Sequence, residues 1–396
     1  MVEVAAFPSR FRAAEERNRR LGRVLRYLGR VDEVDEALVD RLGRAFGRTD
    51  ELGDRLAAAM RRRPTDPDRV TMAQLRTALT HGVAAVDDPP TALREFFAVV
   101  DQTPSWVDPE LLDRGARAFR RFGRNAADVL LQLSLIGGYR FGGPPDLLVA
   151  TGGLTGDGTR RRLAETQAWA VAVTTPGGLA PHAEGWRATL HVRVMHAMVN
   201  QALLGRWDVA RWGLPINQAD QAGTLGLFDG AALIGVRALG VPVSPEDSRA
   251  VMHLWKYVGW LMGVQPEWLV DDERERHRIN YHVVLAQGAI TEAGPRLAQD
   301  IVAVLRTLPH GRWKVERNLS MLSVFLGRRS MRELGLPWRP GWAFAMLWLV
   351  NTLRYRVLER LPGGRDRLER SGAAVAQRIL AEYYGSDERA LAPLPD

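Results

Sequence analysis

The feature that most constrains the fold is a helical spacing of apolar residues, which recurs along the chain while convincing alternating strands are scarce. Residues 51–63 form a clear amphipathic pattern that Pro64 and Pro67 bring to an end. Similar patterns predict helices over residues 91–100, 109–121, 126–136, 160–173, 188–204, 218–239, 245–262 and 342–360. We therefore expect an all-α protein.

Glycine- and proline-rich breaks separate the predicted helices, at residues 142–145, 152–158 and 176–181. Each break is short, which is typical of a turn within a domain and not of a linker between domains. The 396 residues are enough for one large domain. We expect a single domain over residues 1–396, with helical additions at both ends of its core.

The charge of the chain is strongly basic, at +8, but its pattern does not favour nucleic-acid binding. Lys256 and Lys314 are the only lysines, so the basic residues are almost all arginines, as a compositional bias would produce. The arginines are also interleaved with acids, for example over residues 271–276, which is typical of solvated helix faces. We therefore expect no nucleic-acid partner.

The chain has no cysteine, which excludes disulfides and a thiolate ligand for iron or zinc. Residues 1–20 are charged and lack the apolar stretch of a secretory signal. The longest apolar run, residues 342–350, is too short to cross a bilayer. These features predict a cytoplasmic protein.

His196 lies on a largely apolar face of the helix predicted around residues 186–204. Arg193 is one turn away on that face, where it could pair with a carboxylate. His191 is five residues from His196 and points elsewhere, so the two do not form a zinc pair, and no HExxH motif occurs. From the spacing alone, His196 is either a metal ligand or a hydrogen-bonded core histidine, and the second is more common.

The preceding predicted helix presents Arg162, Glu165, Thr166 and Trp169 on one side, at positions i, i+3, i+4 and i+7. Ionisable groups beside a large aromatic ring suit the edge of a reaction pocket, where a buried glutamate would have a raised pKa and could move protons. The alternative is a solvent-facing stripe with a surface Arg162–Glu165 pair, and the spacing alone favours it.

Several short motifs occur in an order that resembles the latex clearing protein (rubber oxygenase) and MpaB oxygenase family. In chain order they are Pro104 to Asp108, Leu133 to Tyr139, Thr151 to Leu154, Arg162 with Glu165 and Thr166, Val192 to Ala197, Trp207, Pro215 to Asp220, Thr224 with Phe228, and Trp255 with Leu261 to Val264. The resemblance covers most of residues 100–265. The extensions, residues 1–99 and 266–396, show no comparable similarity.

The resemblance implies a globin-like helical core that holds haem b. The histidine of the family's Arg-x-x-His-Ala motif is the proximal iron ligand, which here is His196, with Arg193 as a candidate partner for a haem propionate. On the distal side, the rubber-cleaving members carry an arginine, a lysine and a threonine, which correspond here to Arg162, Glu165 and Thr166. Glu165 therefore replaces a lysine that can bind iron, so the resting iron is expected to be five-coordinate or to bind water.

The expected function is that of a haem b-dependent oxygenase, which uses dioxygen to oxidise an apolar small molecule, prenylated or terpenoid-like. Oxidative cleavage of a C=C bond is one such reaction. The secreted rubber-cleaving members act on a polymer, whereas a chain without a secretory signal fits a smaller substrate. Arg162 and Thr166 would orient dioxygen, and Glu165 would act as acid or base. Three further residues would help to wall the pocket: Trp169, Thr224 and Phe228.

Two other functions stay open. A haem peroxygenase, or an oxidase that tailors a natural product, is favoured by Glu165, because peroxide cleavage needs a distal proton carrier. A non-catalytic haem-binding protein is the other. Residues 342–360 could also make weak contact with a membrane surface, since Arg354, Arg356 and Arg360 follow an apolar stretch; a core helix is the alternative. The sequence does not indicate an oligomeric state.

Overall fold

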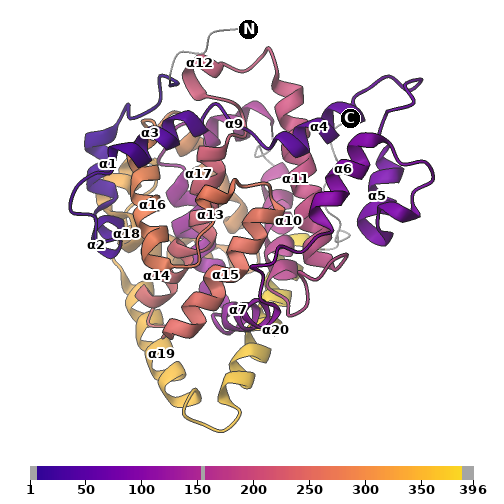
Figure 1. Cartoon of the computed structure of the whole chain (residues 1–396). Helices are drawn as coiled ribbons and strands as arrows, with labels where there is room; N and C mark the ends of the chain where they lie inside the picture. The colour runs from indigo at the N-terminus through magenta and orange to yellow at the C-terminus, as the bar shows by residue number, and fades with distance from the viewer. Residues whose placement is uncertain (1–6, 153–156, 386–396) are drawn as a thin grey trace.

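The computed structural model describes residues 7–152 and 157–385, which form helices and connecting turns with no strand among them (Figure 1). The prediction of an all-α fold is confirmed. Gly153 and Leu154, at the end of one predicted motif, lie outside the described residues. Within the described ranges, no helix is both long and apolar enough to cross a membrane.

The N-terminal helices pack against later parts of the chain. They are α1 (Glu15–Leu21), α2 (Arg23–Leu28), α3 (Glu36–Ala45), α4 (Glu51–Met60), α5 (Met72–His81), the 3-10 turn η1 (Val83–Ala85) and α6 (Thr91–Val100). Side chains fix several starts: Asp35 accepts a hydrogen bond from the backbone N–H of Leu38, and Thr71 and Gln74 form a capping box. Helix α4 lies along α11, which carries His196.

The middle of the chain supplies the helices of the predicted site. They are α7 (Pro109–Arg121), α8 (Arg124–Val129), the π-helical segment η2 (Leu130–Ile136), α9 (Pro144–Ala150), α10 (Asp157–Val173), α11 (Glu184–Leu203), α12 (Val209–Trp212), α13 (Gln218–Phe228), α14 (Gly230–Ala238), α15 (Pro245–Leu261) and the 3-10 turn η3 (Pro266–Trp268). Helix α15 packs along α7, and α10 packs along α11. Trp186, Trp255 and Trp268 are fully buried in this core.

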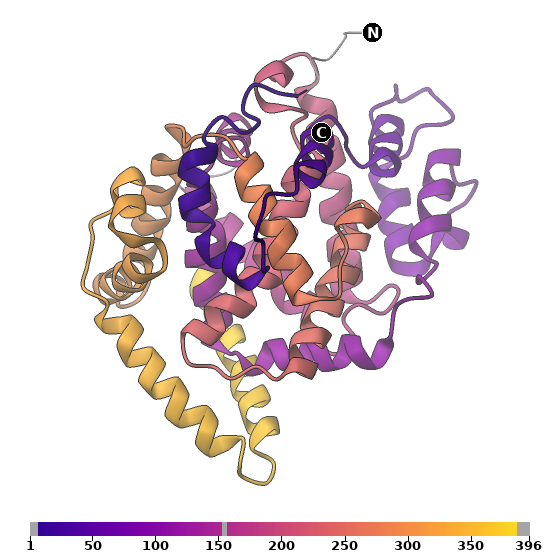
Figure 2. The same cartoon turned by 60° about the vertical axis from the view of Figure 1, so that its left-hand side comes forward.

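The C-terminal helices extend the core and end in a hairpin. They are α16 (Glu273–Ala286), α17 (Ala293–Thr307), α18 (Gly311–Glu333), α19 (Trp342–Leu358) and α20 (Gly364–Tyr384). Both views show α19 running out to one end of the molecule, where the chain turns and α20 returns toward the body (Figures 1 and 2). Helix α20 then packs on α7 and α10.

The prediction of one continuous helix over residues 218–239 is wrong, because the structure has two helices there, α13 and α14, separated at Asp229. Asp229 has non-helical backbone angles, and its carboxylate accepts a hydrogen bond from the N–H of Gly230, so it caps the second helix. The same carboxylate lies 2.7 Å from Nε of Arg276, and both side chains are fully buried. The pair anchors the break to α16, a contact that helical periodicity does not reveal.

Candidate functional site

Helix α10 carries four of the predicted site residues, which differ in their exposure to solvent. Glu165 and Trp169 are buried, Arg162 is half-buried and Thr166 is exposed. The predicted surface pair between Arg162 and Glu165 is replaced by another: Oε1 of Glu165 lies 2.9 Å from Nε of Arg161. The carboxylate of Glu165 is therefore held by an exposed arginine on the adjacent side of the helix.

His196 lies on a face of α11 that the rest of the chain packs incompletely. The residues of this face keep some accessible surface: Val192, His196, Val199 and Leu203. Nδ1 of His196 is nevertheless sealed from solvent and has no hydrogen-bond partner among the described residues. Burial lowers the pKa of His196 to about 4, so the imidazole is neutral at neutral pH.

Two further charges act on His196. After burial, the positive charge of Arg162 is the next cause that lowers the pKa of His196, whereas the negative charge of Asp50 opposes it. Arg162 also acts on Tyr139, whose buried hydroxyl has no partner in the described part of the chain and whose pKa is raised by burial. The charge of Arg162 thus acts on both His196 and Tyr139.

Arg193, one turn before His196, pairs with a carboxylate, as its position predicted. This carboxylate is the side chain of Asp50 and not a haem propionate. Nε of Arg193 lies 2.5 Å from Oδ2 of Asp50 and its Nη2 lies 2.7 Å from Oδ1, a bidentate pair that joins α11 to the start of α4. Nη1 is 3.4 Å from the backbone carbonyl of Leu261. Gly263 passes so close that a Cβ there would lie 2.6 Å from Asp50, and its φ of +83° also favours glycine.

An aromatic cluster joins three helices beside this region. The ring of Trp169 lies 5.2 Å from that of Phe228 and 5.7 Å from that of Trp255, measured between centroids. Phe228 stacks on Trp255 at 5.0 Å. Trp169 is also fixed by a 3.0 Å hydrogen bond from its Nε1 to the hydroxyl of Thr189 on α11. Two of the predicted pocket residues, Trp169 and Phe228, are thus in contact.

Thr224, the third predicted pocket residue, is exposed and lies one helical turn before Phe228 on α13. Its hydroxyl donates to the carbonyl of Asp220 within the same helix at 2.8 Å. The π-helical segment η2 is attached to α13 nearby, since Ser134 donates a 2.7 Å hydrogen bond to the carbonyl of Leu227. Departures from α-helical winding are frequent at functional sites, and η2 leads directly to Tyr139.

A protein-only metal centre is not supported by the described residues, among which no group of three or more histidine, aspartate or glutamate side chains could hold an ion. His196 belongs to no such group among the described residues, so an iron ion bound to it would take its other ligands from a cofactor.

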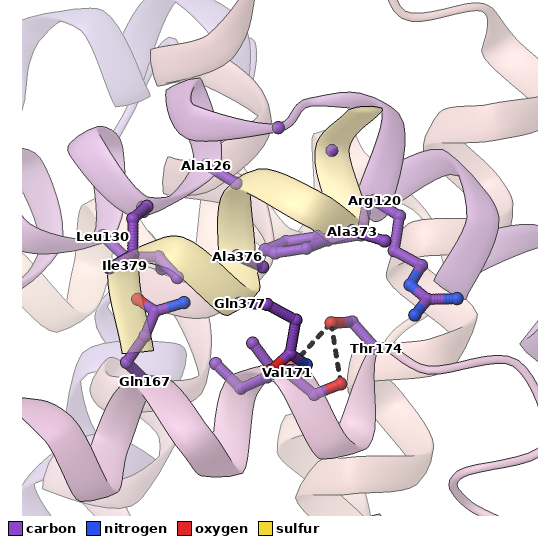
Figure 3. Close-up of a pocket in the computed structure, with 15 residues that line it drawn as sticks. Arg120, Ala126, Leu130, Gln167, Val171, Thr174, Ala373, Ala376, Gln377 and Ile379 are labelled. Carbon is purple, nitrogen blue, oxygen red and sulfur yellow. Dashed lines mark hydrogen bonds between the residues drawn. The ribbon is translucent and has the colours of Figure 1, made fainter. Parts of the chain in front are cut away.

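Two cavities lie elsewhere. The first, of about 40 Å³, lies between α20 and the helices α7, α8 and α10, with Leu130, Val171 and Ile379 among its walls (Figure 3). Its size suits a water molecule and falls well below the roughly 300 Å³ of small-molecule pockets. The second, a groove of about 730 Å³, has charged walls that include Asp146, Arg211, Glu292 and Arg296. Neither includes a predicted site residue.

Four residues of the site region were not singled out from the sequence: Asp50, Tyr139, Arg161 and Trp255. Tyr139 and Trp255 stand within motifs of the predicted core, so the motifs contained a signal, but no role followed from them. Arg161 is four residues before Glu165, a spacing that permits an ion pair. Asp50 is 143 residues from Arg193, and no local pattern links the two.

The chain matches the family described as "ER-bound oxygenase mpaB/B'/Rubber oxygenase, catalytic domain" over residues 120–355. This similarity continues well past residue 265, where the predicted family-like core ends. A similar protein is the rubber oxygenase of Streptomyces sp. (strain K30), 25% identical over 186 residues. That alignment spans 46% of this chain and 45% of the relative, so the chain matches less than half of the relative's length.

The fold is similar to a solved structure described as latex clearing protein in the closed state, with a TM-score of 0.70. The match covers 89% of this chain and 95% of the other, at 22% sequence identity. At this identity, the likeness establishes the helical fold, including most of the predicted extensions.

Proposed function

This chain belongs to the mpaB/rubber oxygenase family, and from that premise we propose that it is a haem b-dependent oxygenase acting on an apolar small molecule. The observation that carries the proposal is His196, a neutral imidazole with an unpaired, buried Nδ1 on an incompletely packed helix face. Nearly all buried polar atoms in proteins have a partner, so such an atom suggests a group that is still to bind.

The residues around His196 fit a haem. Neutral imidazole is the form that binds iron, and three neighbours of His196 along its helix face are the apolar Val192, Val199 and Leu203, which suit a porphyrin. A ring nitrogen of His196 would be the iron ligand in this proposal. Because Asp50 already occupies two of its guanidinium nitrogens, we assign Arg193 to positioning α11 and no longer to a haem propionate.

Residues of α10 would act on the side of the haem that faces away from His196, where dioxygen would bind. When bound, haem supplies the redox chemistry that activates dioxygen. Arg162 would offer guanidinium N–H donors, and the exposed hydroxyl of Thr166 lies one turn further along the same helix. Glu165 would hold or release a proton at its carboxylate, with the 2.9 Å contact from Arg161 fixing its position.

The substrate side of the proposal rests on the aromatic cluster. Trp169 and Phe228 form an apolar wall, held by the 5.0 Å stacking of Phe228 on Trp255 and by the hydrogen bond from Trp169 to Thr189. Such a wall would exclude water and suit a prenylated or terpenoid-like molecule better than a charged one. Oxidative cleavage of a C=C bond remains part of the proposal.

A second candidate, a peroxygenase or oxidase on the same fold, is favoured by one observation: Glu165, the candidate acid or base on α10, is a buried carboxylic acid. A carboxyl group can deliver the proton that peroxide cleavage requires. Single-turnover assays with dioxygen plus a reductant, compared with hydrogen peroxide alone, separate the two functions. Faster product formation with peroxide alone would favour the second.

The haem proposal is tested by the absorption spectrum of purified protein reconstituted with haem b. We expect a Soret band that is lost or strongly altered in His196→Ala, with the matched variant His191→Ala retaining it. Absence of the band from the wild-type protein, or an unchanged spectrum in His196→Ala, would contradict the proposal. Glu165→Lys adds a test of the other side: a six-coordinate, low-spin spectrum is expected if residue 165 reaches the iron.

A further inference from the structure

Helix α19 exposes an apolar stripe to solvent. Seven large apolar side chains on it are at least 42% exposed, and all of these except Trp348 form the stripe: Trp342, Met346, Leu349, Val350, Leu353 and Val357. Their spacing of three, four and seven residues places them on one side of the helix. Single exposed apolar residues are ordinary, but a continuous stripe of this length indicates a contact with another apolar surface.

The stripe is held outward by the packing of the opposite side of α19. There Asn351 donates a 2.8 Å hydrogen bond to the carbonyl of Leu239, and Tyr355 donates one to the carbonyl of Arg121. Both side chains are buried, as is Ala343. The helix therefore cannot turn its stripe inward without breaking buried hydrogen bonds, and it lies on the outside of the body in both views (Figures 1 and 2).

Arginines surround the far end of the stripe, where α19 turns into α20. There are six between residues 354 and 370: Arg354, Arg356, Arg360, Arg365, Arg367 and Arg370. Among the described residues, none of them lies within ion-pair distance of a carboxylate. The segment has three acids, of which Glu359 is half-buried and Glu369 lies 3.9 Å from Arg120, leaving Asp366 exposed.

From this combination we propose that the α19 face binds the surface of a lipid bilayer that contains anionic lipids. Leucine, valine and methionine would enter the boundary between headgroups and acyl chains, and Trp342 suits the interface itself. The arginines would pair with lipid phosphates while their stems cover apolar surface. The opposite side of α19 packs on the protein, so the helix would lie along the membrane.

A second copy of the chain fits this face less well. In a symmetric dimer that pairs the two α19 helices in parallel, the unpaired arginines at the far ends of the stripes would approach one another. Repulsion between like charges opposes such an interface, whereas an anionic bilayer is complementary to it. The inference rests on the stripe and its charges and is independent of the proposed haem chemistry.

Vesicle flotation of the full chain tests the proposal, using phosphatidylcholine vesicles with and without about 30% phosphatidylglycerol. We expect the wild-type protein to float with the anionic vesicles and to dissociate as the NaCl concentration rises. Val357→Asp should lower the partition coefficient by about tenfold or more. Val24→Asp, at an equally exposed valine (58% for both) on α2, should leave it unchanged.

Three results would overturn the proposal: a wild-type protein that stays with the dense fractions, an equal loss of binding in Val24→Asp, or a dimer in ultracentrifugation that Val357→Asp dissociates. A further measurement uses the wild-type protein alone, so its result does not depend on whether the variants fold. Brominated lipids in the anionic vesicles should quench part of the tryptophan fluorescence, because Trp342 enters the interface. Unchanged fluorescence would also contradict lipid binding.

Discussion

Removing Asp50 should destabilise the protein by an amount that depends on Arg193. In Asp50→Ala the guanidinium of Arg193, only 6% exposed as a side chain, loses both of its bonds to a carboxylate and stays buried with its charge. In Arg193→Met the buried charge is removed, and methionine fills much of the same space. The double variant removes both charges at once.

The magnitude follows from the burial of the pair. Breaking a buried ion pair by removing one partner costs about 3–5 kcal/mol of unfolding free energy, whereas replacing both partners by apolar groups is often near neutral. Arg193 keeps a 3.4 Å contact to the carbonyl of Leu261 and lies 5.1 Å from the centre of the Phe96 ring. We therefore expect about 3 kcal/mol for Asp50→Ala, at the lower end of that range.

Urea unfolding followed by circular dichroism at pH 7 measures this coupling across the wild type, both single variants and the double variant. We expect the double variant to be more stable than the sum of the single effects predicts, by at least about 2 kcal/mol. Additive effects, within about 0.5 kcal/mol, would refute the view that the two residues act as a pair. A Soret band that weakens in Asp50→Ala and recovers in the double variant would also tie the pair to His196.

Three further outcomes are expected. Asp229→Ala should lower the unfolding free energy by about 3–5 kcal/mol, because it leaves Arg276 charged and fully buried; a loss under about 1 kcal/mol in urea unfolding would contradict this. Although burial opposes it, hydrogen bonds lower the pKa of Glu273 to about 2, and their donors are His277, Arg237 and Ser248. Because the folded pKa is depressed, this carboxylate stabilises the fold fully above pH 4.5, and that stabilisation is lost as the pH falls from 4.5 to about 2. The wild type should therefore exceed Glu273→Gln in unfolding free energy by up to about 3 kcal/mol at pH 7, and a gap that does not shrink toward pH 2 would argue against this. Phe228→Ala should cost about 3 kcal/mol, at the lower end for a phenylalanine because the side chain is only partly buried, and it should alter the Soret band if this wall borders the haem. Phe97→Ala, at a fully buried phenylalanine, serves as the control for stability loss without a spectral change.

The sequence predicts the helices well because their signals are local. The apolar spacing of residues 109–121 and the proline and aspartate at its start reproduce α7 to the residue. The division of residues 218–239 at Asp229 was not predictable in the same way, since the residues on both sides are apolar enough to continue one helix. The buried charge of Arg276 makes Asp229 a cap, and that partner is 47 residues away in sequence.

The candidate site shows the same limit. Spacing on α10 predicted Arg162, Glu165, Thr166 and Trp169 on one side, whereas the structure buries Glu165 and Trp169 and exposes Thr166, and Trp169 contacts Phe228. It could not tell which arginine pairs with Glu165, because Arg161 and Arg162 are both close enough along the helix. Partners that come from distant helices, such as Asp50 for Arg193, depend on the tertiary packing alone.

The N-terminal helices are therefore part of the site's construction, although the family match begins only at residue 120. Asp50 comes from that region and holds the helix of His196 through Arg193, and its charge opposes the lowering of the pKa of His196 by burial and Arg162. A chain cut before residue 120 would leave Arg193 charged and without its carboxylate, one turn from the proposed iron ligand. The helix of the proposed iron ligand thus depends on a residue outside the range of the family match.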